Sequence, residues 1–197
     1  MMKTFHFTCL VFCLVLLSNS FAANIYFTNN DPNHNLCSSS DNWGDADDSV
    51  PNSADVAKVW GHSPQSNPLT IDNTVSASCA SLEINGESGG PQKAYVTMSS
   101  GTLQTTGRFR LGLNGPNAGG VFNMYDGTIT VGEKLWVSSF GPGEFNMYGG
   151  TIGIADQFAI ATHTGSNTDG RFNLFGGTVT AKSFYTRLGY GVLDIHA

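Results

Sequence analysis

Four stretches in the second half of the chain are variants of one sequence: Val96-Thr-Met-Ser-Ser-Gly-Thr-Leu103, Phe122-Asn-Met-Tyr-Asp-Gly-Thr-Ile129, Phe145-Asn-Met-Tyr-Gly-Gly-Thr-Ile152 and Phe172-Asn-Leu-Phe-Gly-Gly-Thr-Val179. A fifth copy begins at Leu193-Asp-Ile195, and successive copies start 26, 23, 27 and 21 residues apart. Self-similarity at such a period is typical of a solenoid, in which each unit buries its apolar face against its neighbours.

Apolar and polar side chains alternate within each copy. In the third copy we expect Phe145 and Met147 to point into the core, and Asn146 and Tyr148 to point outward. A glycine pair then turns the chain at 149–150, and two further short apolar runs complete the unit. Three short strands per unit of 21–27 residues predict an all-β fold, a single-stranded parallel β-helix that is right-handed by the crossover rule.

The composition agrees with this architecture and excludes several classes of protein. The 24 Gly and 17 Asn residues favour turns. A charged fraction of 12% beside a hydrophobic fraction of 40% is too apolar for a disordered chain and too thinly charged for a coiled coil. The balance of 9 basic to 15 acidic side chains argues against nucleic acid and anionic membrane surfaces as partners.

Stacking the copies in register predicts columns of equivalent side chains, spaced by about 4.8 Å as neighbouring strands are. Amide and hydroxyl columns are expected to bond along the stack, and the repeated glycine is expected to adopt left-handed geometry at a corner. The predicted columns are an asparagine ladder (Asn123, Asn146, Asn173), an inner phenylalanine column (Phe122, Phe145, Phe172), a threonine column (Thr102, Thr128, Thr151, Thr178) and a glycine corner (Gly101, Gly127, Gly150, Gly177).

The chain is expected to divide into three segments. Residues 1–22 carry Lys3, a short apolar run and a terminal Ser20-Phe21-Ala22, the pattern of a signal peptide cut after Ala22. The apolar run is too short to cross a bilayer, which needs about 20 apolar residues. Residues 23–92 lack the repeat and predict an N-terminal cap with irregular first β-coils, and residues 93–197 form the β-helix repeats. The predicted location is therefore secreted or at the cell surface.

Two cysteines, Cys37 and Cys79, remain after cleavage of the signal peptide. In an oxidising compartment a disulfide between them would persist and stabilise the fold by about 2–4 kcal/mol. The sequence leaves two alternatives open, a disulfide or two buried thiols.

The first mature segment resembles a known family. Asn42-Trp43-Gly44, Val50-Pro51 and Ala54-Asp55-Val56-Ala57 look like the opening of exported bacterial β-helix repeat proteins, related to autotransporter-associated strands and to PEP-CTERM-sorted surface proteins. The later Gly-Gly-Thr units resemble their repeats, so the likeness extends over nearly the whole mature chain. The resemblance implies an exported surface or matrix protein with a pectin-lyase-like fold.

The chain departs from this family at its C-terminus, where no sorting signal, anchor or translocator barrel is recognisable. The last residues, Leu193 to Ala197, fall inside a coil. We therefore expect either that the sequence is a fragment followed by further coils, or that a partner covers the open edge, because a bare edge invites aggregation.

Residues with catalytic or metal-binding chemistry are sparse. Pectin-lyase-like enzymes bring Asp together with Arg or Lys on one strand face, whereas the sequence is expected to scatter the candidates over different corners: Asp126, Asp156, Asp169, Arg171, Lys182 and Arg187. No catalytic residue is therefore assigned. A weak calcium site in the cap is the one cofactor considered, on the partial EF-hand-like spacing of Asp31, Asn33 and Asn35, with Asp45 beside it.

Outward aromatic side chains are the remaining candidates for binding. Tyr125, Tyr148 and Phe175 are expected to form one column, and Trp136 and Tyr185 to face outward on the third strand of their units. Such rings could bind sugars of an extracellular polysaccharide through their faces, or they could stack on one another across the coils. The sequence thus predicts a structural or adhesive surface protein without catalytic activity, the alternative being a β-helix that binds or degrades polysaccharide, or a fragment of one.

Overall fold

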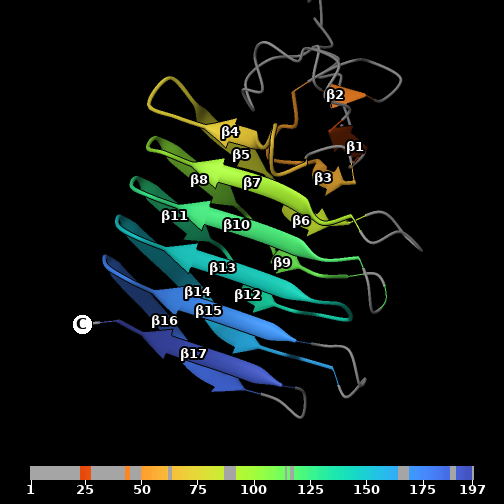
Figure 1. The fold of residues 1–197 in the computed structure, drawn as a ribbon. Coiled ribbons are helices and arrows are strands. Elements are labelled where there is room, and N and C mark those ends of the chain that lie inside the picture. Colours follow the sequence, from red (N-terminus) through yellow and green to blue (C-terminus); the bar gives the residue numbers. More distant parts are fainter. Residues whose placement is uncertain are drawn as a thin grey trace, which may run out of the picture.

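The computed structural model describes residues 23–27, 43–44, 50–61, 64–86, 92–113, 115, 118–163, 169–186 and 190–196. Within these residues the fold is all-β, and stacked parallel coils form a β-solenoid of about four turns. The predicted β-helix is confirmed. Figure 1 shows the coils following one another from the N-terminal strands at the top of the view to β17 at the bottom.

Strands at equivalent places in successive turns make three faces. The first face is a six-stranded sheet of β4 (Leu69–Ile71), β7 (Ala94–Met98), β10 (Gly120–Met124), β13 (Gly143–Met147), β15 (Gly170–Leu174) and β17 (Gly191–Ile195). The second face contains β5 (Ser76–Cys79), β8 (Thr102–Thr105), β11 (Thr128–Val131) and the first halves of β14 (Thr151–Ile160) and β16 (Thr178–Thr186). All pairings between turns are parallel, and the register aligns the sequence copies residue by residue.

The third face contains β3 (Val56–Trp60), β6 (Ser81–Asn85), β9 (Phe109–Leu111), β12 (Lys134–Val137) and the second halves of β14 and β16. At its N-terminal end β1 (Asn24–Phe27) pairs in parallel with β3 and antiparallel with β2 (Trp43–Gly44). The sequence predicted separate strands for the second and third faces of every turn. In β14 and β16 one strand instead runs through both faces, with a register irregularity between Ile154 and Gln157. The two preceding turns have a glycine between these strands, Gly107 and Gly132, whereas Ala155-Asp156 and Lys182 lie at that corner in β14 and β16.

The predicted glycine corner joins the first face to the second. Gly101, Gly127, Gly150 and Gly177 have φ between +83° and +99°, a region that costs other residues about 1–2 kcal/mol. A second column of positive φ follows the third face and is formed by Gly112, Ser138 and Ala161, at +66°, +69° and +55°. The sequence gives little sign of this second corner, since only one of its three residues is a glycine.

The core is built around the predicted phenylalanine column. Phe122, Phe145 and Phe172 are at most 1% exposed, and successive rings stack with centroids 4.9 and 5.0 Å apart. Phe109 and Phe158 pack against the column edge-on from the third face. Each turn therefore buries most of its apolar surface against its two neighbours, as solenoid packing requires.

The asparagine ladder on the first face is also confirmed. Asn173 Nδ2 donates to Asn146 Oδ1 at 2.6 Å, and Asn146 Nδ2 donates to Asn123 Oδ1 at 2.9 Å and to Glu144 Oε1 at 3.0 Å. These asparagines lie on the outer side of the strands, yet Asn146 and Asn173 are only 8% exposed. The ladder thus covers the outer surface of the first face with side chains that bond to one another.

Replacement of the central amide, Asn146→Asp, should destabilise the protein by about 2–3 kcal/mol at pH 7, because a buried carboxylate replaces two donors and faces Glu144. Burial and Glu144 raise the pKa of the new carboxyl above its unfolded value of about 3.9. The loss of unfolding free energy in this variant should therefore be smallest below pH 4 and grow as the pH rises towards the folded-state pKa of the new carboxyl.

Urea unfolding at pH 3.5 and 7, each compared with the unaltered chain, measures this difference. Asn73→Asp is the matched control, since the same chemical change then falls on an exposed turn residue, and its effect should stay within about 0.5 kcal/mol. A deficit for Asn146→Asp that does not depend on pH would contradict this prediction, since it would show that the charge of the buried carboxylate does not cause the loss.

Candidate functional site

The aromatic residues on the outside of the solenoid form a ladder. Tyr125, Tyr148 and Phe175 stack nearly parallel, with centroids 4.9 and 4.8 Å apart and interplanar angles of 9° and 5°. His196 extends the stack, 4.3 Å from Phe175 at 13°, which the sequence did not predict. We call these four residues the outer aromatic ladder. Its three predicted rings, Tyr125, Tyr148 and Phe175, are 41–52% exposed.

The stacking decides which parts of these rings a ligand could reach. A sugar binds an aromatic side chain through the ring face, and both faces of Tyr148 and of Phe175 are occupied by neighbouring rings. Their exposed surface is therefore largely ring edge, with the hydroxyl groups of the tyrosines. Of the two sequence-derived alternatives for this column, the geometry favours stacking across the coils.

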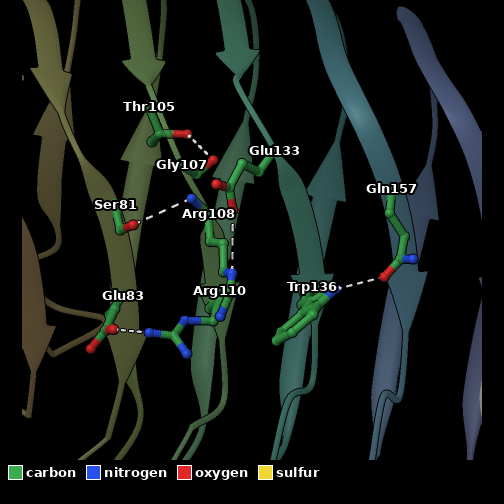
Figure 2. Close-up of polar contacts among 9 residues, drawn as sticks. All are labelled: Ser81, Glu83, Thr105, Gly107, Arg108, Arg110, Glu133, Trp136 and Gln157. Atoms are coloured by element: carbon green, nitrogen blue, oxygen red, sulfur yellow. Dashed lines mark hydrogen bonds and ion pairs between the residues drawn. The ribbon is translucent and has the colours of Figure 1, made fainter.

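A second group of side chains surrounds Trp136 on the third face, and Figure 2 shows Arg108, Trp136 and Gln157 of this group on adjacent strands. The guanidinium carbon of Arg108 lies 5.2 Å from the indole centroid and Lys134 Nζ lies 5.7 Å from it. Trp136 Nε1 donates to Gln157 Oε1 at 3.1 Å. Like the ladder rings, this indole is held by protein side chains, and two of them are cations.

Two ion pairs flank this group. Arg110 Nη2 donates to Glu83 Oε1 in a pair whose side chains are 22% and 8% exposed. Arg108 Nε lies 3.4 Å from Glu133 Oε2 at the surface, where a pair contributes at most about 1 kcal/mol. The Nε of Arg110 is buried and has no acceptor among the described residues. We call Arg108, Arg110, Lys134 and Trp136 the Trp136 cluster.

The strand register aligns the residue at the position of Trp136 with one residue in each other turn of the third face. One outward row runs through Tyr26, Lys58, Glu83, Arg110, Trp136, Ala159 and Tyr185. Lys58 repeats the arrangement of Lys134, since its Nζ lies 4.8 Å from the Trp60 centroid and 5.2 Å from that of Tyr26. Lys58-Val-Trp60 and Lys134-Leu-Trp136 share a Lys-x-Trp spacing, the signal that could have pointed to these lysines in the sequence.

A polar cleft lies at the start of the first face. It has a volume of about 350 Å³ and is lined by Lys93, Glu144, Asp169 and Arg171, together with Gly120, Pro142 and Gly143. The strand register sets Glu144 beside Arg171. The expectation that the charged candidates scatter over different corners is therefore wrong for Asp169 and Arg171, which line one cleft. Glu144 and Lys93 were not among the sequence candidates, because they come from other turns and only the stacking of the coils brings them to this place.

Some sequence predictions fall outside the described residues. These are the signal peptide at 1–22, the calcium candidates Asp31, Asn33, Asn35 and Asp45, and Cys37 of the proposed disulfide. Its partner Cys79 is buried at the end of β5. In the part of the chain that the structure describes, no group of three or more His, Cys, Asp or Glu side chains is placed to hold a metal ion.

Comparison with protein-family models, with curated proteins and with solved structures finds no match to this chain. Within the described ranges, no helix has the length and apolar character needed to cross a membrane. What is established is the architecture, a β-solenoid built from stacked parallel coils.

Proposed function

We propose that this protein is a structural or adhesive β-solenoid that is exported by its N-terminal segment and acts outside the cell without catalysing a reaction. The observation that carries the proposal is the use of side chains between turns. The phenylalanine column and the outer aromatic ladder stack rings from one turn on rings of the next, and the asparagine ladder forms hydrogen bonds between turns. Side chains committed in this way stabilise a rigid rod.

The outer surface supports the same proposal. An adhesive rod needs exposed groups that do not rearrange, and rings held face to face keep their edges fixed relative to the coils. On the first face the asparagine amide groups hydrogen-bond to their counterparts in adjacent turns and so are held in place. Contact with an extracellular surface would then use ring edges, corners and the charged groups of the third face.

The second candidate function is recognition or cleavage of polysaccharide, and the polar cleft favours it. Two carboxylates and two cations line one open volume. Paired acids and basic groups are the residues that polysaccharide hydrolases and lyases use for proton transfer. The sequence resemblance to pectin-lyase-like proteins agrees with this alternative.

Incubation of the protein with pectin and alginate, with and without calcium, separates the two candidates. We expect no growth in the absorbance of unsaturated products, and no new reducing ends, above the rate without protein. The cleft variant Asp169→Asn serves as the matched control for any signal. Sustained turnover that this substitution abolishes would overturn the structural proposal and establish the cleft as an active site.

A further inference from the structure

The basic side chains of this acidic protein are distributed unevenly. Among the described residues, four of seven basic side chains lie on the third face, namely Lys58, Arg108, Arg110 and Lys134. The acidic side chains of the strands and turns around them are Glu83 and Glu133, which pair with the two arginines, Asp55, which accepts from Ala23 N and Asn52 N, and Asp156, whose backbone pairs with Glu133. The chain as a whole has a formal charge of −6, so the third face, where basic and acidic side chains balance, is less negative than the molecule as a whole.

The two lysines of this face are held differently from the arginines. No carboxylate of the described residues lies within ion-pair distance of Lys58 or Lys134. Each ammonium group instead lies over an indole ring, Trp60 in one case and Trp136 in the other. Lys58 Nζ also donates to Tyr26 Oη at 3.5 Å. An ammonium group has three N–H donors, so even Lys58 keeps N–H groups on its outer side, and both charges remain available to an anion.

We propose that the third face binds a linear polyanionic glycan, with Lys58 and the Trp136 cluster contacting its sulfate or carboxylate groups. This rests on the proposed extracellular function and names the chemical class of its partner. Lys58 and Arg110 occupy the same outward row, two strands apart, so an extended chain could cross the coils and meet cations at both places. The strands themselves fix the spacing between these places, which limits the entropic cost of binding.

The geometry favours a glycan over nucleic acid as the polyanion. Binding of single strands relies on aromatic faces onto which bases stack. Trp136 and Trp60 have cations over their rings, and Tyr26 contacts Trp60 edge-on at 5.7 Å. A glycan can be held by its anionic groups alone and needs no open ring.

The polyanion test uses the mature chain with dextran sulfate, alginate, uncharged dextran and a single-stranded DNA oligonucleotide, each titrated by calorimetry at low salt. We expect dextran sulfate or alginate to bind, and dextran and DNA not to bind. The double variant Lys58→Gln/Lys134→Gln, which keeps long side chains over the rings, should weaken binding about fivefold, as two exposed charge contacts of about 0.5 kcal/mol each imply. Affinity should also fall as salt is raised.

Lys182→Gln is the matched control, because it removes one positive charge from exposed β16 and should change the affinity by less than twofold. The inference is overturned if neither anionic glycan binds, if dextran binds as well as dextran sulfate, if DNA alone binds, or if Lys182→Gln weakens binding as much as the double variant. Turnover of pectin or alginate is measured separately, so its appearance would refute the proposed function without deciding where the glycan is held.

Discussion

Substitution of Gly150 by alanine should cost about 3–4 kcal/mol of unfolding free energy. Gly150 has φ of +84°, and a Cβ added there would lie 2.5 Å from the carbonyl oxygen of Gly127 and 2.7 Å from Met124 Cε. The backbone oxygen cannot move without disturbing the preceding turn, where Thr151 N donates to Gly127 O at 2.9 Å. The loss therefore combines backbone strain with a clash against main chain.

The control for this prediction lies three residues along the same coil. A Cβ added at Gly153 would meet only Thr180 Oγ1, at 3.9 Å. Alanine is favoured over glycine inside a strand by about 0.5–1 kcal/mol, so Gly153→Ala should be neutral or slightly stabilising. Chemical denaturation of both variants gives the comparison, and equal losses at the two positions would contradict the account of the glycine corner.

The second large effect is expected at the centre of the core. Phe145→Ala should lower stability by about 3–5 kcal/mol, because Phe145 is fully buried and stacks on Phe122 and Phe172 from both sides. The substitution leaves a cavity that the rigid coils cannot close. Against a total stability of about 5–15 kcal/mol for a typical protein, this loss should be visible as a large drop in the urea midpoint.

Tyr148→Ala gives the matched comparison for this prediction. Tyr148 also lies between two rings, at 4.9 and 4.8 Å, but it is 43% exposed. Ring stacking contributes about 0.5–1.5 kcal/mol per pair beyond burial, so the loss should be about 1–2 kcal/mol. If Tyr148→Ala were as costly as Phe145→Ala, ring stacking rather than burial would be the main source of stability in both columns.

The repeat made most of the fold predictable from the sequence. A residue such as Asn146 recurs with its neighbours at nearly the same spacing, so one strand assignment determines the register of the whole face. The inner Phe145 column, the outer Tyr148 column and the corner at Gly150 all follow from that register. Alternation alone, however, says only that Asn146 points outward, and its burial depends on the side chains from adjacent turns that cover it.

The features that the sequence did not give depend on contacts without a repeated pattern. Ser138 and Ala161 adopt positive φ although neither is glycine, and Ser138 is held there by its hydroxyl, which donates to Gly141 O at 2.8 Å. Arg110 and Glu83 become partners only through the register of β6 and β9. The conformation and partners of residues that do not recur in the repeat depend on contacts that the repeat pattern does not contain.

The parallel register of the three faces also determines how the rod would carry mechanical load. Hydrogen bonds between strands point along the solenoid axis, so a pull between the first and last coils crosses every interface between turns. At each interface the bonds of all three faces share that load with the stacked columns inside and outside. Under such a load the solenoid would therefore yield at its weakest pair of turns, while the remaining coils keep their structure.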